Sequence, residues 1–141
     1  MAANQTPRFV NTIKTYGATV DSAAANVDVF EAGTDGSKIE HLAITTTDTA
    51  SARTLSLFTE DGSSNVFQIG TIAIAAGAGF AAGVAPENGL DATELPFLAD
   101  DAHGNKFLNI QEGHKLVVSI DALTGGKEVT VHAGVRDYSS D

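Results

Sequence analysis

The run Lys127-Glu128-Val129-Thr130-Val131-His132-Ala133-Gly134-Val135-Arg136 alternates between apolar and polar or small side chains. Successive side chains of a β-strand point to opposite faces, so this period of two gives the strand one apolar face. That face carries Val129, Val131, Ala133 and Val135. A single apolar face predicts a half-buried antiparallel strand.

A second run, Lys115–Asp121, has the same period, with Leu116, Val118 and Ile120 on its apolar face. Thr124-Gly125-Gly126 lies between the two runs, and paired glycines suit the tight loop of a β-hairpin. The two runs are therefore predicted to form a hairpin.

Turn signals separate further β-like runs. Gly33-Thr34-Asp35-Gly36 and Asp61-Gly62-Ser63-Ser64-Asn65 are clusters of residues that favour turns. The runs are Val27–Glu31, Lys38–Thr47, Arg53–Glu60, Val66–Ile74, Lys106–Gln111, Lys115–Asp121 and Lys127–Tyr138. None keeps a helical period. Short strands with regularly spaced turns predict an all-β fold, an antiparallel β-sandwich that is jelly-roll-like.

Residues 1–26 are predicted to be an extended N-terminal arm, and residues 27–141 the β-sandwich domain. The arm has only short apolar pieces, Phe9-Val10 and Ile13, followed by the alanine-rich Ser22–Ala25. Such a segment packs on its own domain or on a neighbour, or it is a partly disordered terminus. Both alternatives stay open. Residues 1–20 are expected to carry the binding to a partner, so their deletion should weaken attachment while leaving the sandwich folded.

Val66–Ala85 carries no charge and superficially suggests a membrane span. Its many glycines and alanines give little insertion energy, so the span is rejected. We expect instead a buried strand to about Ile74, then a flexible Ala/Gly loop to Val84. Residues 75–105 form the longest irregular region, and a loop of this length is often functional.

The charge of the chain excludes some partners. Its 18 acidic and 8 basic residues give a net charge of -10. Such a chain repels nucleic-acid phosphates and anionic membranes, so neither is an expected partner. There is no cysteine, which excludes disulfides and thiolate chemistry. Met1–Pro7 lacks the basic and apolar segments of a secretory signal.

A search for chemistry is mostly negative, so no enzyme activity, cofactor or metal site is predicted. The histidines His41, His103, His114 and His132 have no metal-ligand spacing. His132 alone is a candidate for a pH-sensitive contact. Asp100–Asn105 has oxygens that suit calcium but lacks the EF-hand spacing, so a solvated loop closed by Asx-turn hydrogen bonds is the preferred interpretation.

Four segments together resemble a known family: Gly36–Ile44, Leu55–Gly62, Leu116–Ser119 and Val129–Tyr138. Their order is similar to that in small β-sandwich proteins of tailed phages, the capsid decoration (head-stabilising or cement) proteins. The resemblance spans roughly residues 30–138 and rests on strand patterns rather than on catalytic motifs.

The resemblance implies a structural virion protein that binds the outer surface of a phage capsid and bridges neighbouring capsomers. Its implied partners are the major capsid protein and itself, as a homotrimer on the capsid. The arm and the Ala/Gly loop are the expected contacts. The candidate contact residues are Arg8, Phe9, Val10, Ile13, Ala75, Gly77, Gly79 and Phe80.

Two alternatives belong to other classes. A phage tail, baseplate or glycan-binding module would gather aromatics at one end, with Phe80, Phe97 and Phe107 as candidates, although core packing is the simpler expectation for them. An enzyme, such as a small β-sandwich hydrolase or a cupin-type isomerase, ranks last because clustered histidines are missing.

Overall fold

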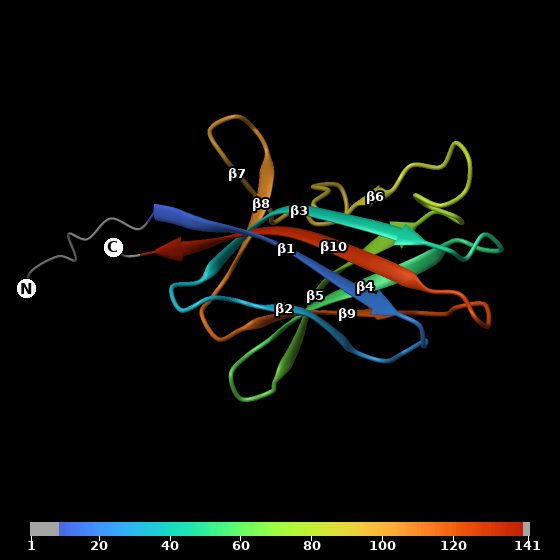
Figure 1. Cartoon of the computed structure of the whole chain (residues 1–141), viewed down its shortest axis with the longest axis horizontal. Helices are drawn as coiled ribbons and strands as arrows, with labels where there is room; N and C mark the ends of the chain where they lie inside the picture. The colour runs from blue at the N-terminus through green and yellow to red at the C-terminus, as the bar shows by residue number, and fades with distance from the viewer. Residues whose placement is uncertain (1–8, 140–141) are drawn as a thin grey trace, which may run out of the picture.

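In the computed structural model, which describes residues 9–139 and the side chains of residues 13–138, two antiparallel sheets pack face to face (Figure 1). The described residues contain no helix, and therefore none that could cross a membrane. The predicted all-β sandwich is confirmed.

Each sheet has a simple strand order. The first sheet runs β1 (Phe9–Val20), β10 (Val129–Ser139), β3 (Ser37–Thr46), β8 (Lys106–Ile110) and β7 (Ala99–Asp100), and β6 (Glu87–Asn88) also pairs with β3. The second sheet runs β2 (Val27–Glu31), β9 (Lys115–Ile120), β4 (Arg53–Glu60) and β5 (Val66–Ile74). The long strands after β1 lie within two residues of the predicted runs at both ends.

The pairing of the long strands is nested. β1 pairs with β10, β2 with β9, β3 with β8 and β4 with β5, all antiparallel. The chain is thus one long antiparallel ribbon that has been rolled up. Rolling adds the pairs β10–β3 and β9–β4, which complete the two sheets. Eight long strands in two such sheets make a jelly roll.

The core between the sheets is aliphatic. The apolar faces predicted for β9 and β10 both point into it, since all their members are at most 1% exposed. β3, β4 and β5 contribute Ile39, Leu42, Ile44, Leu55, Leu57, Ile72 and Ile74. Burial of these large side chains drives the two sheets together.

The predicted hairpin between β9 and β10 is wrong, because the two strands lie in opposite sheets. Their apolar faces meet across the core instead of lying side by side. The alternation is the same in both arrangements, so it fixes which face is buried but not which strand is the neighbour. The segment with Gly125 and Gly126 crosses from one sheet to the other.

Phe9–Val20 is an edge strand of the first sheet rather than a separate arm. β1 pairs with β10 along its whole length, and Val20 is fully buried. The tyrosine ring of Tyr16 stacks on Phe30 of the second sheet at a centroid distance of 5.1 Å. The predicted boundary at residue 26 therefore cuts off the first jelly-roll strand, and a chain without residues 1–20 would lose part of the core.

β5 is an edge strand rather than the expected buried one. Val66 and Phe67 are 40% and 55% exposed. The later half of β5 is covered by the segment after β6: the Leu95 side chain lies where a Cβ on Gly70 would be, and Leu95 is fully buried. Gly70 thus lets this segment close over the edge of the sandwich.

Gly70→Ala should lower the free energy of unfolding by about 1–3 kcal/mol, the usual effect of overpacking. The added Cβ would collide with the Leu95 side chain. Gly62→Ala is the matched control, because no atom lies within 4 Å of the Cβ it would add. Urea unfolding of both variants measures the difference. Equal stability of the two would contradict the close packing of Leu95 on Gly70.

Candidate functional site

The Ala/Gly loop, residues 75–86, is fastened to the end of β3. The N–H of Gly77 donates to the carbonyl of Asp48 at 2.8 Å, and the N–H of Thr46 donates to the carbonyl of Ala78 at 2.9 Å. Ala78 is fully buried. The loop is therefore hydrogen-bonded to the backbone at the end of β3.

Hydrogen bonds within the loop give it a closed shape. The N–H groups of Phe80 and Ala81 both donate to the carbonyl of Gly77, and the N–H of Gly79 donates to the carbonyl of Val84 at 2.9 Å. The flexible loop expected from the sequence is thus a folded one. Although the loop is rich in glycine and alanine, its backbone forms hydrogen bonds within the loop and with the end of β3.

Two glycines allow this fold. Gly77 and Gly79 have φ angles of 70° and 67°, a region that side chains with a Cβ rarely enter. A Cβ on Gly79 would also lie 2.5 Å from the Thr45 side chain. The glycines predicted as partner contacts therefore shape the loop, and the side chain that they present to solvent is Phe80.

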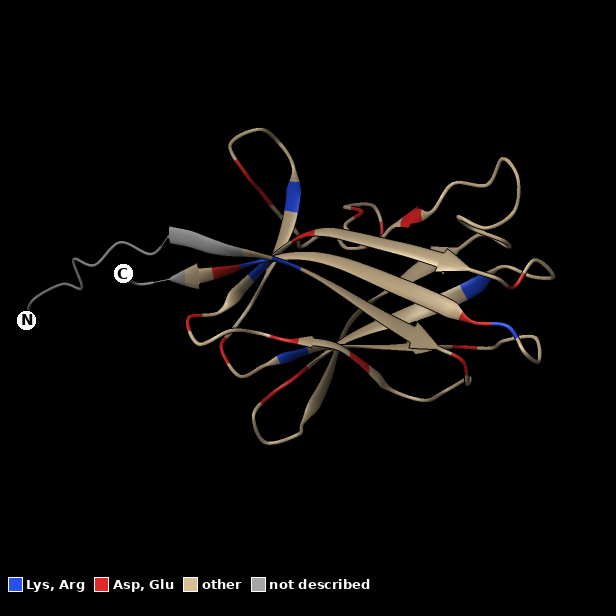
Figure 2. Cartoon of the chain, viewed as in Figure 1, with Lys and Arg blue, Asp and Glu red and all other residues tan. Residues whose placement is uncertain are grey.

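Phe80 is the exposed aromatic of this loop, with 62% of its surface accessible. The loop carries no charge, and Figure 2 shows it as an entirely tan projection at one end of the sandwich. Core packing, the simpler expectation for the phenylalanines, is wrong for Phe80 and also for Phe97, which is 51% exposed. An exposed aromatic on a preformed loop is a common anchor for a partner protein.

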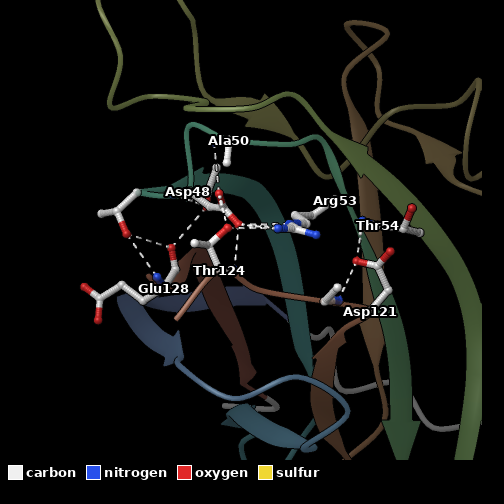
Figure 3. Close-up of polar contacts among 10 residues, drawn as sticks. Asp48, Ala50, Arg53, Thr54, Asp121, Thr124 and Glu128 are labelled. Carbon is white, nitrogen blue, oxygen red and sulfur yellow. Dashed lines mark hydrogen bonds and ion pairs between the residues drawn. The ribbon is translucent and has the colours of Figure 1, made fainter. Parts of the chain in front are cut away.

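Asp48 fixes the base of the loop (Figure 3). Its side chain is fully buried and accepts hydrogen bonds from the Thr124 N–H (3.0 Å), the Thr124 hydroxyl (3.0 Å), the Ala50 N–H (3.1 Å) and Arg53 Nε (2.9 Å). Arg53 Nη2 lies 2.7 Å from the same carboxylate. The segments β3–β4 and β9–β10 are thereby joined next to the Ala/Gly loop.

These hydrogen bonds also determine the charge of Asp48. The Thr124 N–H, followed by the Arg53 guanidinium and the Ala50 N–H, holds the pKa of the carboxyl far below its usual range despite burial. Each donor stabilises the ionised form. A carboxylate whose ionised form accepts this many hydrogen bonds is unsuited to proton transfer near neutral pH, so Asp48 has a structural role.

The carboxylate cluster that suggested calcium is a closed turn. Asp101 Oδ1 accepts from the N–H groups of His103 and Asn105 at 2.8 and 2.9 Å, and Asp100 forms an ion pair with Lys106. The preferred interpretation, a turn closed by its own aspartate, is confirmed. Within the described residues, no group of three or more His, Asp or Glu side chains could hold a metal ion.

A polar groove of about 610 Å³ lies on the outer face of the first sheet. Arg136 Nε donates to Glu40 at 2.7 Å, and Lys38 Nζ lies 4.5 Å from the centre of the Phe107 ring. The remaining lining residues are His41, Asn88, Leu90, Asp101, Gly104, Asn105 and Lys106. The sequence did not predict this groove, since its members come from four strands and a turn.

The predicted contact residues fall into two groups. Ala75, Gly77, Gly79 and Phe80 all belong to the Ala/Gly loop. Ile13 is 72% exposed on β1, where it pairs with Arg136 of β10. The side chains of Phe9 and Val10, and all of Arg8, lie outside the described part of the chain.

Comparison with known proteins adds no further constraint: no protein-family model matches the chain, and no curated protein matches its sequence.

Asp48→Asn should destabilise the fold at pH 7 more than Asp121→Asn does. Asp121 lies at the same end of the sandwich but is exposed, and its carboxylate accepts from the N–H groups of Thr54 and Ala122. Because the folded state lowers the pKa of Asp48, its stabilising contribution is full above about pH 4 and is lost as the pH falls below that value.

The gap in stability between the wild type and Asp48→Asn should therefore narrow on acidification. Urea unfolding at pH 7 and at pH 3 measures it. A gap that does not change with pH would contradict an ionised Asp48 in the folded protein.

Proposed function

We propose that this chain is a structural virion protein that binds the outer surface of a phage capsid and stabilises it by bridging neighbouring capsomers. The major capsid protein is the proposed partner, and the copies cluster on the shell as a homotrimer. The strand patterns that resemble capsid decoration proteins suggest the partner, and the geometry of the Ala/Gly loop supports a binding role.

The observation that carries the proposal is the preformed, uncharged Ala/Gly loop with Phe80 exposed on it. Binding loses less conformational entropy when the binding loop is already ordered. The hydrogen bonds to β3 and the Asp48 network supply that order. The loop can thus offer an apolar anchor to a shell even though the chain as a whole is acidic.

Stabilisation of a shell needs no catalysis. A protein that binds the assembled lattice, and not the dissociated subunits, stabilises the lattice by mass action. The acidic groups that surround the strands would then face solvent and keep the coated particle soluble. The loop and the charge distribution fit these two requirements.

A second candidate, a tail, baseplate or glycan-binding module, is favoured by the polar groove. The groove combines an aromatic ring, Phe107, with the charged groups Lys38, Glu40 and Arg136 and with amide side chains. Its volume lies in the range of small-molecule sites. Hydrogen-bonding groups around one aromatic side chain suit a sugar.

Co-sedimentation with mature heads of the phage that encodes the chain tests the first proposal. The wild type should bind to saturation at a fixed ratio of subunits to capsomers. Phe80→Ala should raise the dissociation constant about 10-fold or more, as truncation of an interface anchor does. Phe67→Ala is the matched control, because Phe67 is similarly exposed but lies on β5. Failure of the wild type to bind heads would overturn the proposal.

A glycan array, followed by titration of any sugar that binds, tests the second candidate. Arg136→Ala should weaken binding of that sugar about 10-fold or more, because it removes a charged donor from the groove. Lys127→Ala removes a cation outside the groove and should leave binding unchanged. If no glycan binds, or if both variants bind equally, the groove is not a sugar site.

A further inference from the structure

The outermost strands of the two sheets differ in how their edges are protected. An open edge offers unpaired N–H and C=O groups to any other strand, so proteins usually shorten, charge, bulge or cover it. β6 and β7 have two residues each. β2 has five residues, with a bulge and two acidic side chains, Asp28 and Glu31. These edges offer little to pair with.

The long edge strand β5 is protected by carboxylates and by a covering segment. Glu94 Oε2 accepts from the N–H of Ala73 at 2.6 Å, and Glu87 Oε1 accepts from the N–H of Ala75 at 3.2 Å. Leu95 packs over Gly70 in the middle of the strand. The later half of β5 is therefore unavailable to a second strand.

β1 has none of these protections between Ile13 and Val20. It is a twelve-residue strand, and its only bulge lies before Ile13. Within the described residues, β10 is its only strand partner, and no side chain whose position is described bonds to the backbone between Ile13 and Val20. Its one charged side chain, Lys14, forms an ion pair with Asp137 of β10 at 2.7 Å and so is neutralised within the sheet.

β1 is also an edge without acidic side chains. It contains no Asp or Glu, whereas the whole chain has a net charge of -10. β5 contains none either, but the carboxylates of Glu94 and Glu87 lie against its outer backbone. In Figure 2 the part of β1 that is not grey is tan and blue, with no red, while red acidic residues gather at the ends of other strands and in the turns. Two copies that meet along β1 therefore bring together edges that carry no acidic side chains.

We propose that β1 is a homotypic interface: it pairs antiparallel with β1 of a second copy, about a two-fold axis perpendicular to the first sheet. Directly opposite residues of an antiparallel pair point to the same face. The two-fold axis must therefore pass between one residue and the same residue of the second copy. A register centred on Tyr16 places Ile13 opposite Thr19 and Thr15 opposite Gly17 of the second copy. It also places each Lys14 opposite an alanine, Ala18, and not opposite the other Lys14.

The charge of the two copies gives this contact a salt dependence. Each carries a net charge of -10, and backbone pairing along an edge without acidic groups does nothing to offset that repulsion. Added salt screens the repulsion. The dimer should therefore become tighter as the ionic strength rises, the opposite of a contact held by complementary charges. This inference does not depend on whether the protein binds a capsid.

Sedimentation velocity of the purified full chain over a range of concentrations tests the interface. The wild type should show a reversible monomer–dimer equilibrium that shifts to dimer with salt. Thr15→Lys should raise the dissociation constant of the dimer about 10-fold or more, because it places two cations close to the two-fold axis. Thr71→Lys, the same change at an exposed position of the protected strand β5, should leave the equilibrium unchanged.

Cross-linking provides a second readout that does not depend on the lysine variants. The chain has no cysteine, so Thr15→Cys and Thr71→Cys each introduce a single thiol. In the register centred on Tyr16 the two Thr15 positions lie about 8 Å apart. A thiol-specific reagent of that length should link Thr15→Cys into dimers and leave Thr71→Cys monomeric.

A wild type that stays monomeric at all concentrations and salt levels would overturn the proposal. Equal cross-linking at both positions would overturn it as well. Capture of an extended peptide along β1 by a monomer that never self-associates would assign the edge to a different occupant, and so would also count against it.

Discussion

The nested pairing of the ribbon is the constraint on which the other features of this protein depend. The first strand, β1, pairs with the last, β10. Inside this pair β2 pairs with β9, β3 with β8 and β4 with β5. Rolling this ribbon gathers connections that are distant in the sequence at the same end of the sandwich. Asp48 and Thr124 meet for that reason, although 76 residues separate them. The fastening of the Ala/Gly loop follows from the same closure.

Buried and half-buried carboxylates hold the turns of this acidic chain in place. Asp61 and Asp101 act in the same way: each accepts from the N–H groups two and four residues later, and from the side chain of an asparagine, Asn65 or Asn105. In both turns these hydrogen bonds lower the pKa of the aspartate. Part of the negative charge is thus explained by turn closure, a local requirement of the fold, rather than by a partner.

Local pattern predicted most of the strands but not their neighbours. The period of two in β10 identified its buried face, because side-chain alternation is a local property. Whether β9 lies beside β10 or across the core depends on the rolling of the ribbon, which the pattern does not record. β1 escaped prediction because an edge strand buries little: Val20 is fully buried, but Ile13 is exposed. The Asp48 network is tertiary and leaves no local signal.

For the proposed site, the composition of the sequence predicted which loop makes the contact, but not which of its residues would face the partner. An uncharged stretch rich in glycine and alanine identified the loop, and its residues were expected to allow close approach of a partner. Instead Gly77 and Gly79 allow close approach within the chain, against Ala81 and Thr45. The partner is then left with Phe80. Sequence reasoning could not separate the two roles, because both favour small residues.

The two proposed surfaces can operate at the same time. The Ala/Gly loop is hydrogen-bonded to the end of β3, whereas the open edge runs along β1, and β10 lies between these strands (Figure 1). The two-fold contact along β1 is distinct from the contacts within the proposed homotrimer, and it would join copies from two such trimers. A two-fold axis perpendicular to the sheet reverses the strand direction, so a pair joined along β1 presents its two Phe80 loops at opposite ends. Such a pair would contact a lattice at two separated points, and the second contact would form at a high effective concentration. Two weak loops could then bridge neighbouring subunits of a shell without a large interface on either copy.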